Sequence, residues 1–167
     1  VEHPVSEEVT GWDLVRWQFE IAEGAHLPAA DPTVIGHSIE LRINAEDPGR
    51  GFMPAPGTLT RWRPPTGPGV RMEEGYRRGM TVPGAFDSLL GKLIITGPNR
   101  HECLARARRA LDEFIVDGMP TVVPFHKLLL RDPAFIAEDG DFRVHTNWIE
   151  TEFDGQIEPY AGELGEP

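Results

Sequence analysis

Cysteine is almost absent from the 167-residue sequence, which contains only Cys103. A single cysteine cannot form a disulfide bond within the chain, and this excludes the disulfide-stapled scaffolds of secreted proteins. We therefore expect a protein of the reducing cytoplasm. Cys103 lies in a segment with helical periodicity, so we expect its side chain to pack in the core, where free cysteines are commonly found.

Long apolar runs are absent as well. No stretch approaches the roughly 20 apolar residues that a membrane-spanning helix requires, and no signal peptide is visible. The sequence therefore indicates no membrane partner.

Basic residues are scarce, because 16 lysines and arginines stand against 27 aspartates and glutamates, which gives a net charge of −11. This balance argues against a nucleic acid as the partner. The acidic excess gathers in residues 151–167, which we expect to leave the fold as a polar linker. The six histidines show no metal-binding spacing, and no metal site is predicted.

What the chain does contain is enough for one domain of ordinary size with a real core. Its 18 glycines and 16 prolines cluster at residues 54–57 and 64–69, which indicates long turns rather than disorder. The first residue is valine rather than methionine, and it begins inside a sequence motif. We therefore expect the sequence to be part of a longer protein.

The stretch Gly36–Pro48 has the clearest pattern in the chain. Its apolar residues recur at every second position, at Ile39, Leu41 and Ile43. This period of two predicts a strand with one face in the core. The other face then carries Glu40 and Arg42, and a fixed guanidinium there is a candidate anion site. A surface salt bridge between these two side chains is the alternative that the pattern leaves open.

Hydrophobic periodicity predicts the remaining elements. Helical spacing covers residues 11–23 and 100–114, the second helix starting at a capping-box pattern from Asn99 to Glu102, and a short helix capped by Thr121 follows. Extended segments are expected at residues 1–11, 57–63, 70–73, 89–96 and 142–148. Helices and strands are segregated rather than strictly alternating, so we predict an α+β fold with a mainly antiparallel sheet and flanking helices.

Five blocks of the sequence, in the same order, resemble the biotin carboxylase family of biotin-dependent carboxylases. They are VEHPVSEEVTG (1–11), GHSIELRINAEDP (36–48), FMPAPGTLTRW (52–62), FDSLLGKL (86–93) and RRALDEFIVDGMPT (108–121). One block alone would be weak evidence, but five in order across nearly the whole chain are specific. The run TNWIETEFDG (146–155) is most similar to the biotinylated α-subunits of bacterial acyl-CoA carboxylases.

The resemblance implies a division of the chain into three parts. Residues 1–34 would be the truncated C-terminal end of an ATP-grasp domain, residues 35–150 the biotin carboxylase C-terminal domain, and residues 151–167 the acidic linker. The intact enzyme would be a ligase that uses ATP, Mg and bicarbonate to form carboxyphosphate and then carboxylates biotin on a biotin carboxyl carrier domain. A carboxyltransferase subunit would pass the carboxyl group to acetyl-CoA or propionyl-CoA.

Two other interpretations remain open. One is another ATP-grasp ligase, such as a carbamoyl-phosphate synthetase-like large chain, although the RINAEDP block argues against it. The other is a non-catalytic module that keeps the fold as a scaffold in a carboxylase complex.

The resemblance also implies roles for single residues. Glu2, in the VEHP motif, would be the base that deprotonates bicarbonate, and Val1 would contribute backbone contacts beside it. Arg42 would hold bicarbonate and stabilise the enolate of biotin. Asp87 would lie near the same cleft in a supporting position, and Thr146 would lie against the adenine ring.

The departures from the family pattern carry predictions of their own. The family's glycine-rich loop, phosphate-binding lysine and metal-holding carboxylates would all precede Val1, and no Met-Lys-Met biotinylation site is present. We therefore expect the 167-residue chain alone to be inactive and to hold no cofactor. Arg71 matches an arginine of the family's dimer contact, but Pro68 replaces an aromatic residue there, so we expect a weak homodimer at most.

Overall fold

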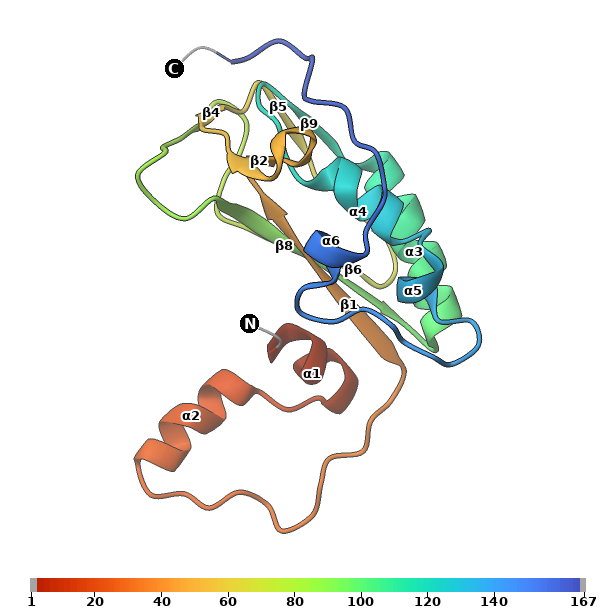
Figure 1. Cartoon of the computed structure of the whole chain (residues 1–167). Coiled ribbons are helices and arrows are strands. Elements are labelled where there is room, and N and C mark those ends of the chain that lie inside the picture. Colours follow the sequence, from red (N-terminus) through yellow and green to blue (C-terminus); the bar gives the residue numbers. More distant parts are fainter. Residues whose placement is uncertain (1–2, 166–167) are drawn as a thin grey trace.

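A computed structural model describes residues 3–165 of the chain. Its centre is a three-stranded antiparallel sheet with the strand order β1-β8-β6, formed by β1 (His37–Asn44), β8 (Leu89–Gly97) and β6 (Val70–Glu74). The long helix α3 (Arg100–Glu113) packs along one face of this sheet (Figure 1). The predicted α+β class with mainly antiparallel strands is confirmed.

The register of β1 on β8 separates a core face from an outer face. Leu41 lies opposite Leu93, and Ile39 lies opposite Ile95. These four side chains are buried in one cluster with the apolar side of α3. Because side chains alternate across a strand, the polar residues of β1 face the other way. The alternation seen in the sequence is confirmed for this strand.

Three short antiparallel pairs surround the central sheet. They are β2 (Glu46–Asp47) with β3 (Met53–Pro54), β4 (Gly57–Thr58) with β7 (Thr81–Val82), and β5 (Arg61–Arg63) with β9 (Ile115–Asp117). A 3₁₀ turn, η1 (Pro48–Arg50), follows β2.

Helix α3 begins where the capping pattern predicts. The Asn99 side chain accepts a hydrogen bond from the backbone N–H of Glu102 at 2.9 Å, which satisfies one of the free donors of the first turn. One turn later Cys103 is fully buried, and this burial raises the pKa of its thiol to about 11. The expected packing role of Cys103 is confirmed.

A second, smaller apolar cluster lies beside the first. It is built on α4 (Val123–Leu129), α5 (Pro133–Ile136) and α6 (Trp148–Thr151). Phe125, Leu129 and Trp148 are its buried members, and Phe52 and Phe153 pack against them. Through Phe125 and Leu129, this cluster holds the side of α4 that faces away from the sheet.

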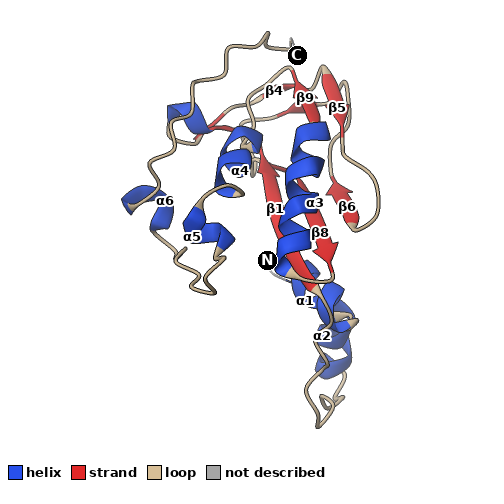
Figure 2. Ribbon diagram, turned by 90° about the vertical axis from the view of Figure 1, so that its right-hand side faces the viewer, coloured by secondary structure: helices blue, strands red, loops and turns tan. Residues whose placement is uncertain are grey.

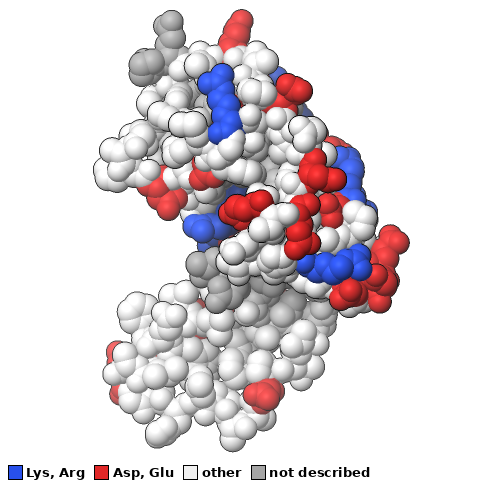
Figure 3. Space-filling model, in the orientation of Figure 1, with Lys and Arg blue, Asp and Glu red and all other residues white. Residues whose placement is uncertain are grey.

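The N-terminal segment packs on this body in part. It contains α1 (His3–Thr10), which lies near β1, and α2 (Leu14–Ala22), which projects below the sheet (Figures 1 and 2). The predicted apolar stripe of α2 is exposed, with Phe19 70% accessible, and so is Ile35 at 74%. On the face drawn in Figure 3 the N-terminal segment carries few charged side chains, whereas acidic and basic side chains gather on the rest of the domain above it. Among residues 3–165, no helix is long and apolar enough to cross a bilayer.

Two local predictions at the helices were wrong. Within the described part of residues 1–11, the chain is helical from His3 rather than extended, because Pro4 falls in the first turn, where the N–H that proline lacks has no helical partner. Thr121 does not cap α4, since the N-cap is Val122 and no side chain bonds the first turn.

Two predictions near the C-terminus also differ from the structure. Residues 142–147 form no strand and lead by a turn into α6. Within the described part of the expected linker, the chain folds back over the domain. The backbone N–H of Tyr160 donates to the Asp47 carboxylate at 3.2 Å, and that of Gly165 donates to Gly118 O at 2.7 Å. The acidic charges are compatible with docking because apolar residues between them, such as Phe153, pack on the second cluster.

Candidate functional site

The outer face of the central sheet presents a row of three charged side chains. Arg42 on β1 lies opposite Lys92 on β8, which lies opposite Glu73 on β6. Residues directly opposite one another in antiparallel strands project from the same face. The sheet therefore holds these three groups in line, with the guanidinium at one end.

Arg42 is exposed, while its neighbours along β1, Leu41 and Ile43, are buried. Within residues 3–165, no carboxylate lies within ion-pair distance of its guanidinium, so the alternative of a salt bridge with Glu40 is not formed. A guanidinium presents a planar fork of donors that suits a carboxylate-like anion. Arg42 is thus placed to receive an anionic ligand.

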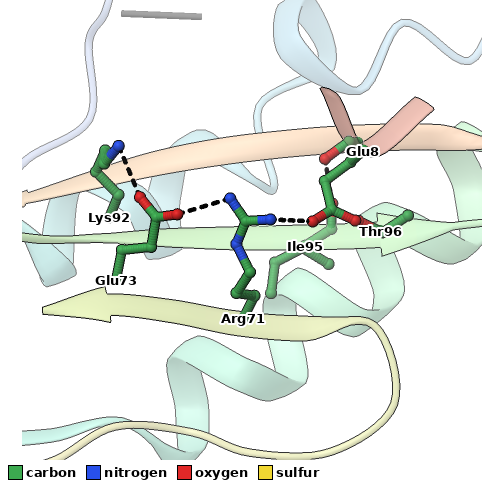
Figure 4. A network of polar contacts seen from close by, with 7 residues as sticks. Glu8, Arg71, Glu73, Lys92, Ile95 and Thr96 are labelled. Atoms are coloured by element: carbon green, nitrogen blue, oxygen red, sulfur yellow. Dashed lines mark hydrogen bonds and ion pairs between the residues drawn. The ribbon is translucent and has the colours of Figure 1, made fainter. Parts of the chain in front are cut away.

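At the other end of the row, polar contacts tie the sheet to helix α1. Lys92 Nζ lies 2.7 Å from Glu73 Oε2, and Arg71 Nη2 lies 2.7 Å from Glu73 Oε1 (Figure 4). Arg71 Nη1 also pairs with Glu8 of α1, and Glu8 accepts a hydrogen bond from the Thr96 hydroxyl at 3.1 Å. These contacts fix α1 against the outer face.

A second polar group gathers where β1 ends. Asn44 Nδ2 donates to Glu46 Oε1 at 3.0 Å and to Ser88 Oγ at 3.1 Å, and the Ser88 hydroxyl donates to Glu46 Oε1 at 2.5 Å. Asp87, the preceding residue, is exposed, and its carboxylate accepts from the Leu89 N–H at 2.8 Å. The structure thus brings Asp87 to the end of the strand that carries Arg42.

The other candidates are placed differently. Val1 and Glu2 lie outside the described residues. Thr146 is exposed in the turn before α6. The described residues contain no group of three His, Cys, Asp or Glu side chains placed to hold a metal ion.

Sequence reasoning missed the partners in the row, Lys92 and Glu73. Lys92 interrupts the apolar run of β8 at a position whose Cα partner is Arg42, but this pairing depends on the register. A register cannot be fixed from one strand alone, because a slip by one residue exchanges the two faces.

Glu73 provides a test of this network. The hydrogen bond from Lys92 lowers the pKa of the Glu73 carboxyl. The stabilisation from a lowered carboxyl pKa is present above the pKa of the unfolded chain and is lost as the pH falls through the folded-state pKa. We expect Glu73→Gln to reduce the free energy of unfolding at neutral pH by up to about 1 kcal/mol, the usual range for an exposed pair.

The measurement is urea unfolding of the full-length protein at neutral pH and near pH 3, with the exposed Glu23→Gln as the control. The difference between Glu73→Gln and the unmodified protein should disappear at the acidic pH. An equal loss at both pH values would contradict this role of the charge.

Comparison with known proteins assigns the chain to a family. Residues 40–151 match the family model of the biotin carboxylase C-terminal domain. The chain belongs to the biotin carboxylase family. Residues 1–30 match the ATP-binding domain of the carbamoyl-phosphate synthase L chain.

Individual relatives support the same assignment. The chain is 56% identical over 161 residues to the biotin-dependent acyl-coenzyme A carboxylase alpha3 subunit of Mycobacterium leprae, covering 96% of this chain and 27% of that protein. It is 50% identical to the biotin carboxylase of Pseudomonas aeruginosa, over 87% of this chain and 32% of that protein.

Among solved structures, a similar fold occurs in the biotin carboxylase domain dimer of the Hydrogenobacter thermophilus 2-oxoglutarate carboxylase, in complex with MgADP and bicarbonate. Its TM-score is 0.79 at 39% identity, over 90% of this chain and 33% of that one. The chain therefore spans about a third or less of the length of these relatives.

Proposed function

We propose that this chain supplies the C-terminal part of the biotin carboxylase component of an acyl-CoA carboxylase α-subunit. The observation that carries the proposal is the exposed guanidinium of Arg42 at the end of a charged row, in a chain of the biotin carboxylase family. On this proposal the intact enzyme carboxylates biotin with ATP, Mg and bicarbonate. The biotin is carried by a carrier domain, and a carboxyltransferase subunit that selects the acyl-CoA receives the carboxyl group.

The proposed division of labour rests on the chemistry of two side chains. A glutamate carboxylate can accept a proton, which is the role proposed for Glu2 toward bicarbonate. A guanidinium stays protonated, so Arg42 can hold bicarbonate and offset negative charge developing on biotin without giving up its own proton. Val1 and Asp87 are proposed to support this site, and Thr146 to contact the nucleotide.

The proposed domain boundaries separate these roles. Residues 1–34 would complete an ATP-grasp domain, and residues 35–150 would form the domain that carries Arg42. The phosphate and metal ligands are proposed to be supplied by the remainder of the enzyme; among the described residues no group of three His, Cys, Asp or Glu side chains is placed to hold a metal ion. When bound, MgATP would supply the energy for activating bicarbonate.

This arrangement predicts that the 167-residue chain alone will neither bind nor hydrolyse MgATP measurably. The core around Leu93 and Leu111 does not involve a nucleotide, so the chain is still expected to fold. Calorimetric titration of the isolated chain with MgATP checks this, after circular dichroism has established that the chain is folded. A micromolar dissociation constant would contradict the assignment of the nucleotide site to the rest of the enzyme.

A further prediction concerns assembly. Pro68 is exposed, and the guanidinium of Arg71 already pairs with Glu8 and Glu73 of its own chain. Burial of an aromatic side chain at this position would stabilise a dimer by about 1.5–3 kcal/mol. Proline lacks this contribution, and in a two-fold interface the contribution is missing from both subunits. We expect the full-length enzyme to dimerise weakly, with Pro68→Phe tightening the dimer in sedimentation equilibrium. A tight dimer centred on Pro68 and Arg71 in the unmodified enzyme would contradict this.

The function itself is tested by bicarbonate-dependent ATP hydrolysis with free biotin, using the full-length protein. ATP hydrolysis that rises with both bicarbonate and biotin is the expected result. Hydrolysis that responds to an ammonia donor instead of biotin would favour a carbamoyl-phosphate synthetase-like ligase. No turnover in a folded, complete protein would favour a scaffold.

A further inference from the structure

Strand β1 is an edge strand, and helix α4 covers its open side. The strand pairs with β8 on one side only, so main-chain carbonyls on its other side need different partners. Two alternate carbonyls of β1 accept hydrogen bonds from the segment that carries α4. The backbone N–H of Val122 donates to Asn44 O at 3.2 Å, and the His126 ring nitrogen Nε2 lies 2.8 Å from Arg42 O. Figure 2 shows α4 beside β1, on the side away from β8.

The contact fixes the tautomer of His126. A carbonyl oxygen can only accept, so Nε2 carries the proton and donates to Arg42 O. The side chain is only 8% exposed, and this burial lowers the pKa of His126, which keeps the ring neutral. The other ring nitrogen, Nδ1, is buried without a hydrogen-bond partner among residues 3–165. The imidazole therefore has one polar anchor, and that anchor is the backbone of Arg42.

Helix α4 is itself held firmly. Phe125 and Leu129 are buried in the second apolar cluster with Trp148, on the side of α4 away from the sheet. The contact from His126 therefore joins a packed helix to the residue whose guanidinium faces the candidate site.

We propose that His126 is a positioning residue for Arg42. The inference rests on the proposed function, because it assigns His126 a part in the reaction only through the Arg42 guanidinium. The His126 hydrogen bond holds the Arg42 carbonyl from the open edge, while the flanking residues Leu41 and Ile43 pair with β8 on the other side. Catalytic geometry is sensitive to shifts of this kind, since a displacement of about 1 Å can cost roughly 10²-fold in rate.

The test uses the full-length enzyme and three histidine variants. His126→Leu removes the donor and leaves Arg42 O without a partner. His126→Gln keeps an amide N–H at a similar distance from the backbone and serves as the rescue. His101→Leu, at an exposed position on α3, is the matched control. We expect kcat for biotin carboxylation to fall by roughly 10- to 10²-fold in His126→Leu, with the KM for MgATP unchanged and most of the loss restored in His126→Gln.

A double variant separates positioning from stability. If His126 acts through Arg42, then His126→Leu will lower the rate no further in an Arg42→Ala background. An equal fold-loss in both backgrounds would overturn the inference, as would a lowered melting temperature with unchanged kcat. Should His126→Leu not fold, His126→Asn applies the same test, because its amide is one methylene too short to reach Arg42 O.

The two proposals fail in different ways. Normal turnover in Arg42→Ala alone would refute the proposed function. Lost turnover in Arg42→Ala with normal turnover in both His126→Leu and His126→Asn would refute only the positioning role.

Discussion

Arg42→Lys is expected to lower the rate of biotin carboxylation by the full-length enzyme by roughly 10²–10³, the cost typical of removing one oxyanion donor. Lysine keeps the positive charge but presents a single point of charge in place of a planar fork of donors. A bidentate grip on bicarbonate, or on charge developing on biotin, would therefore be lost although the electrostatic attraction remains.

The melting temperature should barely change in this variant. Arg42 is exposed at the outer face of β1, and among residues 3–165 its guanidinium forms no ion pair that the substitution would break. The core contacts of the strand come from Leu41 and Ile43 on the opposite face. Surface substitutions of this kind usually change the free energy of unfolding by less than about 0.5 kcal/mol.

Steady-state kinetics and thermal unfolding of the same preparation check both halves of this prediction. Arg63→Lys, at an exposed position on β5, is the matched control and should leave both quantities unchanged. Normal turnover in Arg42→Lys, with or without a lowered melting temperature, would show that the planar fork is not needed.

The exposed position of Arg42 could be predicted from the sequence because it depends on local information. Strict alternation over several residues leaves one choice of core face once the isoleucines are assigned to it. Helix α3 was predictable for a similar reason, since both its cap at Asn99 and its apolar stripe lie within the helix. In both places, local propensity and tertiary packing favour the same structure.

The parts that could not be predicted depend on distant partners. The row that runs from Arg42 through Lys92 to Glu73 requires the register of three strands that are far apart in the sequence. The hydrogen bond from His126 to Arg42 O joins residues 84 positions apart, and the residue pattern of α4 does not predict it. The strand predicted at residues 142–148 is absent for a different reason, because its local pattern was ambiguous. A short alternation of apolar residues also suits a turn that packs Trp148 inward.

Helix α1 bears directly on the second catalytic candidate. Glu2 lies outside the described residues, but it immediately precedes this helix in the sequence. The contacts of Glu8 with Arg71 and Thr96 fix α1 against the outer face of the sheet that also carries Arg42. The helix that follows Glu2, the proposed base, is therefore anchored to the sheet that carries Arg42.

Glu2→Gln is expected to reduce bicarbonate-dependent turnover of the full-length enzyme by about 10²–10⁴, the range that a positioned general base contributes. The amide keeps the size and most of the hydrogen-bonding capacity of the carboxylate, but it cannot take up a proton at neutral pH. Binding of MgATP should be largely unaffected, since its ligands are proposed to lie elsewhere in the enzyme.

The measurements are turnover at saturating bicarbonate and the Kd for MgATP, with Glu23→Gln, an exposed position after α2, as the control. Saturating bicarbonate matters because a variant that merely bound bicarbonate weakly would recover its rate there, whereas a variant without a base would not. Lost turnover with an unchanged Kd for MgATP would support the assignment of the proton-transfer step to Glu2. Recovery of turnover at high bicarbonate would reduce Glu2 to a binding residue, and normal turnover throughout would remove it from the mechanism.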